Sequence, residues 1–164
     1  MKKLQVFYEG RGERWPLATL ADDGRHLLFE YSAEALEQGL GLSPRHLALR
    51  ASAFGGFPEP QMRLPGLVAD ALPDGWGLML MDRLFRKAGR PSSGLSPLDR
   101  LAFIGTRAMG ALTFEPADPL ALSGEDVQLL ELAQQAQAVI ANKDTEALKA
   151  LALMGGSPHG ARPK

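Results

Sequence analysis

The residues best suited to chemistry form one short run near the end of the sequence, GGSPHGARPK at positions 155–164. Glycines let backbone N–H groups approach phosphate oxygens closely, and a serine hydroxyl can add a hydrogen bond. A lysine such as Lys164 adds a point charge that suits a phosphate group. A frayed tail rich in glycine and proline has a similar composition, so the run alone leaves both interpretations open.

Other candidate residues give weaker indications. The three histidines, His26, His46 and His159, lie far apart, and none stands at metal-ligand spacing from a carboxylate. Ser157 and His159 are two residues apart and do not normally face each other, and no acidic residue lies nearby to orient the imidazole. Since the chain has no cysteine, thiolate catalysis and cysteine-ligated zinc are excluded.

Composition narrows the function classes further. The 18 basic and 19 acidic residues give a net charge of −1, which favours no direct binding to nucleic acid or to an anionic membrane. The apolar run near the first residue is too short for a signal peptide, and no segment approaches the roughly 18 apolar residues of a membrane span. We therefore expect a cytoplasmic protein without a membrane segment.

The first part of the sequence has the alternation of β-strands. LQVFYEG has β-branched and aromatic residues and ends in Gly10. Asp22, Asp23 and Gly24 predict the turn of a hairpin between LATL and HLLFEY. A short helix follows, in which Ser32 is the expected N-cap residue and a glycine ends the helix.

The middle of the sequence changes to helical periodicity. Asp74 is the expected cap of a helix over GWGLMLMDRLFRKAG, whose common face holds Trp76, Met79, Leu80 and Leu84. Ser96 and Asp99 predict a capping box before a second helix, and GALTFEP predicts a single strand. The clearest helix begins after Ser123 and carries a stripe of apolar residues: Leu129, Leu132, Ala133, Ala136 and Ile140. A shorter helix from Asp144 reaches the glycines of the terminal run.

These patterns predict an α+β fold, with an antiparallel β-rich subdomain at 1–65 packed against a helical layer. The region 66–154 is mainly helical, with one strand near 110–116. The region 155–164 is then the start of a glycine-rich nucleotide loop.

Three motifs, taken in order, resemble the HipA family of serine/threonine kinases, which are toxins of bacterial type II toxin–antitoxin systems. They are LPDGWG, SPLDRLAFIGTRAMGALTF and GGSPHGARPK, and the resemblance runs over the whole chain. Two positions depart from the family pattern. Asp74 stands where glutamate is commoner, and Arg107 and Ala108 occupy the region where an acidic residue is often found.

The resemblance implies that the complete kinase binds ATP and Mg²⁺. It assigns the nucleotide loop to six consecutive residues, which are His159, Gly160, Ala161, Arg162, Pro163 and Lys164. Ser157 falls where the family has a serine that the kinase phosphorylates on itself. A phosphate there adds a charge of about −1.5 to −2 and can repel the phosphates of ATP.

The resemblance also implies partners. These are a HipB-like helix-turn-helix antitoxin or the remaining kinase region, with operator DNA reached only through the antitoxin. An aminoacyl-tRNA synthetase is the implied substrate of the parent kinase.

The family's catalytic aspartate and metal ligands come later in the kinase fold. We therefore expect this chain to be an N-terminal region that is inactive alone. Two alternatives remain open at this point: a stand-alone, non-catalytic subunit that binds and restrains a separate HipA-like kinase, and an unrelated α+β interaction domain.

Overall fold

The computed structural model of the chain describes residues 1–122. The helices expected from Ser123 and from Asp144, and the glycine-rich run at 155–164, lie outside the described residues.

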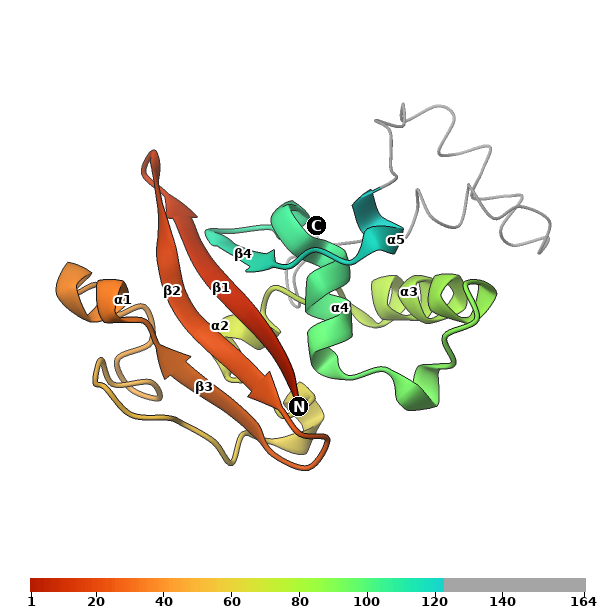
Figure 1. Cartoon of the computed structure of the whole chain (residues 1–164), viewed down its shortest axis with the longest axis horizontal. Helices are drawn as coiled ribbons and strands as arrows, with labels where there is room; N and C mark the ends of the chain where they lie inside the picture. Colours follow the sequence, from red (N-terminus) through yellow and green to blue (C-terminus); the bar gives the residue numbers. More distant parts are fainter. Residues whose placement is uncertain (123–164) are drawn as a thin grey trace, which may run out of the picture.

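A four-stranded antiparallel sheet forms the largest element of the fold (Figure 1), with the strand order β3-β2-β1-β4. The strands are β1 (Lys2–Gly10), β2 (Glu13–Asp22), β3 (Leu27–Tyr31) and β4 (Leu112–Glu115). Since β4 pairs with β1, the sheet joins segments from both sides of the domain boundary expected at residue 65. That boundary stays a prediction, whereas the α+β fold is confirmed.

The turn between β2 and β3 lies where the sequence predicts it. The Asp23 carboxylate accepts hydrogen bonds from the backbone N–H groups of His26 and Arg25, at 2.7 and 2.8 Å. These two bonds, that from His26 first, lower the pKa of Asp23 to about 2. Gly24 has a φ of +94°, a value that favours glycine, so the residue types of this turn match its backbone.

A β-bulge interrupts the alternation of β2. The pairing register with β1 shifts between Val6 and Phe7, so Val6 lies opposite Ala18 while Phe7 lies opposite Pro16. The extra residue, Leu17, is buried next to the buried Ala18. Because of the bulge, the apolar residues of β2 that precede it and those that follow it lie on the same, inner face of the sheet.

Residues 1–122 contain five α-helices, of which α1 and α4 pack against the sheet. They are α1 (Ala33–Gln38), α2 (Gly66–Ala69), α3 (Gly75–Lys87), α4 (Pro97–Ile104) and α5 (Pro119–Leu122). Short 3-10 turns lie at η1 (Glu59–Gln61), η2 (Ser92–Gly94) and η3 (Gly105–Arg107). Figure 1 shows α4 between the sheet and α3. Ser32 caps α1 and Gly39 ends it in a left-handed conformation, which confirms the short helix.

The expected common face of α3 is only half right. Leu80 and Leu84 are buried, but Trp76 and Met79 are 54% and 38% exposed. The helix instead turns Gly77, Met81 and Phe85 toward the core together with the two leucines. Phe85 packs edge-on against Phe103 of α4, with ring centroids 5.4 Å apart. This aromatic contact sets the rotation of α3 and leaves Trp76 and Met79 on its outer side.

Within residues 1–122, none of the helices combines the length and the apolar character needed to cross a membrane.

Candidate functional site

The site predicted from the sequence lies outside the described residues. This holds for Ser157 and for all six residues of the predicted nucleotide loop: His159, Gly160, Ala161, Arg162, Pro163 and Lys164. Their roles stay predictions. The structure does describe the other two motifs, LPDGWG and SPLDRLAFIGTRAMGALTF, and shows what each one does in the fold.

The LPDGWG motif starts helix α3. The Asp74 side chain accepts hydrogen bonds from the backbone N–H groups of Trp76 and Gly77, each at 3.1 Å. These groups have no partner within the helix, so the carboxylate satisfies them and its charge suits the positive end of the helix dipole. Aspartate, with its short side chain, is among the residues preferred at an N-cap.

We expect the change Asp74→Ala to lower the free energy of unfolding by about 1 kcal/mol, because both N–H groups lose their acceptor. Urea unfolding followed by circular dichroism measures this. Asp74→Asn is the matched control, since an asparagine oxygen can accept the same bonds. Equal losses in the two variants would contradict a capping role.

The second motif links α4 to β4 through two glycines. Gly105 ends α4 with a φ of +56°, and a Cβ atom there would lie 3.4 Å from that of Ala117. Gly110, just before β4, has a φ of +116°. Both values favour glycine, so these residues let the chain reverse and place β4 beside β1. The backbone conformation therefore explains the two glycines of this motif.

A cluster of charged side chains joins this motif to the N-terminus and to the end of α3. Lys2 Nζ lies 2.5 Å from Asp99 Oδ2, and Arg90 contacts Asp99 Oδ1 at 3.2 Å and Asp118 Oδ2 at 2.5 Å. Asp99 also accepts the Ser96 N–H at 2.8 Å, which is one half of the predicted capping box.

The environment of Asp99 alters its acidity. Partial burial alone would raise the pKa of Asp99, but hydrogen bonds from Lys2 and Ser96 and the charges of Lys2 and Arg90 outweigh that effect. The pKa of Asp99 therefore lies below its usual value, and the carboxylate is charged at neutral pH. The cluster holds α4, the chain after α3 and the start of β1 together; no sequence motif indicated it.

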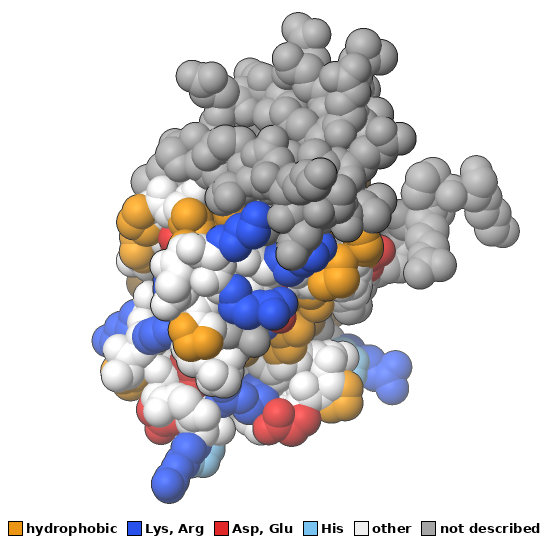
Figure 2. All heavy atoms as spheres, turned by 90° about the vertical axis from the view of Figure 1, so that its right-hand side faces the viewer, with side chains coloured by type: hydrophobic (Ala, Val, Ile, Leu, Met, Phe, Trp, Pro, Cys, Tyr) orange, Lys and Arg blue, Asp and Glu red, His pale blue; other side chains and the backbone are white. Residues whose placement is uncertain are grey.

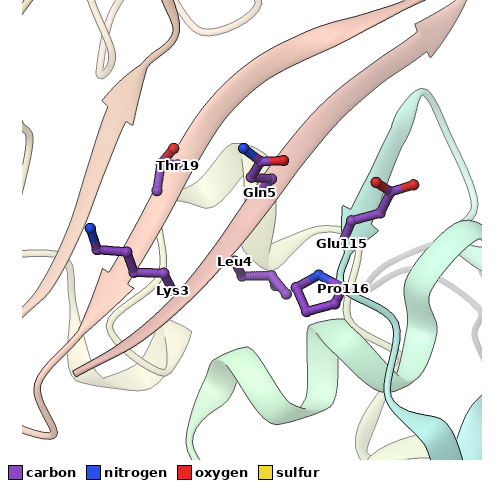
Figure 3. A pocket seen from close by; sticks show the side chains of 6 residues that line it. All are labelled: Lys3, Leu4, Gln5, Thr19, Glu115 and Pro116. Atoms are coloured by element: carbon purple, nitrogen blue, oxygen red, sulfur yellow. The ribbon is translucent and has the colours of Figure 1, made fainter.

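A groove lies on the outer face of the sheet (Figure 3). It has a volume of about 550 Å³ and is lined by Lys3, Leu4, Gln5, Thr19, Glu115 and Pro116. Gln5 lies opposite Thr19 on β2 and opposite Glu115 on β4, so polar groups of three strands share one side. Glu115 forms an ion pair with Arg14, whose Nη2 atom lies 2.6 Å from Glu115 Oε1.

The groove offers an ammonium, an amide, a hydroxyl and a carboxylate, which can hydrogen-bond to a polar ligand. The sequence signal for it is the alternation of Lys3 and Gln5 with the buried residues of β1, but alternation alone does not distinguish a groove from an ordinary solvated face. In the described part of the chain, no group of three or more metal-ligating side chains could hold a metal ion.

Comparisons with curated proteins and with solved structures give no match. A comparison with protein families matches residues 4–115 to the HipA N-terminal domain. The matched region takes in all of the sheet except the first two residues of β1, together with the LPDGWG cap of α3 and the link from α4 to β4, and it covers more than half of the chain. The chain therefore belongs to the HipA N-terminal domain family.

Proposed function

We propose that the chain is the N-terminal region of a HipA-like serine/threonine protein kinase toxin of a type II toxin–antitoxin system. The observation that carries the proposal is the family match over residues 4–115, with GGSPHGARPK following it in the sequence. Family membership also makes the third interpretation, an unrelated α+β domain, wrong.

In this proposal the chain contributes part of an ATP site rather than a complete one. The backbone around Gly160 approaches the phosphates, Lys164 supplies a positive charge at the far end of the loop, and Ser157 is the regulatory phosphorylation site. ATP and Mg²⁺ bind in the complete kinase, whose remaining residues hold the metal. The donor types of the run suit a phosphate group.

The same proposal names the partners. A HipB-like helix-turn-helix antitoxin or the remaining kinase region binds this domain in the cytoplasm, operator DNA is reached only through the antitoxin, and an aminoacyl-tRNA synthetase is the candidate substrate. The net charge of −1 supports an indirect link to DNA, because a balanced charge supplies no overall attraction to the phosphate backbone.

The test compares the purified chain alone with the same chain joined to the kinase region of a HipA-like protein. Only the joined protein should transfer phosphate from labelled ATP, because positioning and metal electrostatics supply most of the catalysis. Transfer by the chain alone would contradict the proposal. If the separate chain instead lowers the activity of the kinase region, the chain is a restraining subunit.

In the joined protein, we expect Lys164→Ala and Gly160→Val each to weaken ATP binding by about tenfold, the effect of losing one charge-assisted contact or one close backbone approach. Ser157→Ala should remove self-phosphorylation and leave transfer to other acceptors intact. Arg45→Ala changes an exposed arginine outside both this run and the groove, and it serves as the control with unchanged affinity. Unchanged affinity in both loop variants would show that the run is only a tail.

A further inference from the structure

Two aspartates of the chain are each followed directly by a glycine, in the pairs Asp23–Gly24 and Asp74–Gly75. The backbone nitrogen of such a glycine can attack the side-chain carbon Cγ of the aspartate, because glycine has no Cβ atom to obstruct the approach. The N–Cγ bond forms, a Cγ–O bond breaks and water leaves, which closes a succinimide ring. Water then opens the ring, and one product is isoaspartate, whose main chain runs through Cβ and Cγ. The mass of the chain is unchanged.

Exposure does not distinguish the two pairs. Gly24 and Gly75 are both exposed, and a Cβ atom built on either one would meet no other atom within 4 Å. Trp76, which follows Gly75 directly, is also exposed. Figure 2 faces the side of the molecule on which α3 lies and shows hydrophobic side chains open to solvent there. The water that opens a succinimide ring can therefore reach both places.

Hydrogen bonds hold both reacting groups of the Asp23–Gly24 pair. The Gly24 N–H donates to Asp22 Oδ1 at 2.8 Å, so the attacking nitrogen is already engaged. Asp23 Oδ1 accepts the N–H groups of His26 and Arg25, and Asp23 Oδ2 lies 3.5 Å from His26 Nδ1. These backbone bonds, that from His26 first, lower the pKa of Asp23 to about 2. The neutral carboxyl group, which is the better electrophile, is therefore rarer than in an ordinary aspartate.

The Asp74–Gly75 pair has fewer such restraints. Asp74 Oδ1 accepts the N–H groups of Trp76 and Gly77, at 3.1 Å each. Gly75 is the first residue of α3, where an N–H group has no acceptor within the helix. In the described part of the chain, neither the Gly75 N–H nor Asp74 Oδ2 has a hydrogen-bond partner. The nitrogen is thus available for the attack, and one carboxyl oxygen is available to leave.

We propose that Asp74–Gly75 is a site of spontaneous isoaspartate formation in the folded chain, and that the turn between β2 and β3 protects Asp23–Gly24 from the same reaction. Isoaspartate would lengthen the main chain between Asp74 Cα and Gly75 N by one carbon atom and leave the free carboxylate on Cα. The hydrogen bonds to Trp76 and Gly77, which cap α3, would then be lost. The proposal does not depend on the kinase function.

Incubation of the purified full chain at neutral pH, followed by a short trypsin digestion, tests this proposal. Trypsin cleaves after lysine and arginine, so it places the two pairs in separate peptides, 15–25 and 64–83. An isoaspartyl peptide keeps its mass but separates in chromatography, and fragmentation in the mass spectrometer assigns the position. In the folded chain, isoaspartate should accumulate at position 74 at least about fivefold faster than at position 23, where additional hydrogen bonds must break first. In guanidinium chloride, which unfolds the chain, the two rates should become similar.

Two kinds of variant separate the causes. Gly75→Ala should slow the reaction at position 74 severalfold, because the added methyl group hinders the attack, and the open space around it lets the fold stay unchanged. Asp22→Ala should speed the reaction at position 23, because it releases the Gly24 N–H. Asp22→Asn keeps an acceptor oxygen and is the matched control, with a slow reaction. Circular dichroism of each variant checks that the fold is kept.

Equal rates at the two positions in the folded chain would overturn the proposal. So would a folded chain that forms no isoaspartate at position 74 under conditions in which the unfolded chain does. If Gly75→Ala left the rate at position 74 unchanged, attack by the Gly75 nitrogen would not be the cause. This comparison needs no change at Asp22, so it decides the matter even if Asp22→Ala does not fold.

Discussion

Replacing Phe114 with alanine should lower the free energy of unfolding by about 3–5 kcal/mol, the usual cost of removing a buried aromatic ring. Phe114 is fully buried and lies opposite Val6 on the inner face of the sheet. It sits on β4, a strand of four residues whose only partner among the described strands is β1. The cavity would therefore open at the place where the C-terminal part of the fold joins the sheet.

Urea unfolding of the full chain measures this loss. Met109→Ala is the control, because Met109 lies on the surface three residues before β4 and its removal should change the free energy by no more than about 0.5 kcal/mol. A Phe114→Ala variant as stable as the control would show that β4 does not hold the fold together.

The elements that the sequence predicts well are those with local signals. The Asp22–Gly24 turn, the Ser32 cap of α1 and the Asp74 cap of α3 each depend on residues only a few positions apart. Side chains and backbone groups at such short separations meet whatever the rest of the chain does. Turn and cap residues therefore specify these boundaries directly.

Long-range pairing leaves no such signal. The sequence predicts a strand at GALTFEP, but it does not show that this strand pairs with β1. The contact between Lys2 and Asp99 spans 97 positions, and the two residues share no motif. The exposure of Trp76 is also decided at a distance, since the contact of Phe85 with Phe103 fixes how α3 is rotated. Periodicity gives a helix its faces but not the neighbour that each face meets.

The candidate sites show the same difference between local and long-range signals. The run GGSPHGARPK is visible in the sequence because its chemistry depends on adjacent residues, whereas the groove of Figure 3 appears only when the strands are placed side by side.

Replacing Arg90 with alanine should cost about 2–3 kcal/mol at neutral pH, because Asp118 is buried and loses its charged partner. The expected loss of unfolding free energy is smaller than for a fully buried ion pair, since the Arg90 side chain is 37% exposed. Its guanidinium contacts Asp99 and Asp118 with different nitrogens and lies over the ring of Phe85, 4.6 Å from its centre. Arg90→Lys can reach only one carboxylate, so it should lose part of this stability.

The cost of Arg90→Ala should also depend on pH, and Asp99 gives the direction. The pKa of Asp99 is lower in the folded chain than its usual value of 3.8, so its stabilising effect is complete above about pH 4 and is lost as the pH falls through the lowered pKa. A protonated Asp99 no longer pairs with Arg90, and removing the arginine then costs less. The urea midpoints of the natural chain and of Arg90→Ala should differ by the same amount at pH 7 and at pH 5. At pH 3 the difference should be smaller. Arg45→Ala, which changes an exposed arginine, should show no such change. If the difference in urea midpoint between Arg90→Ala and the natural chain were the same at all three pH values, Asp99 would not contribute to the stability of this cluster.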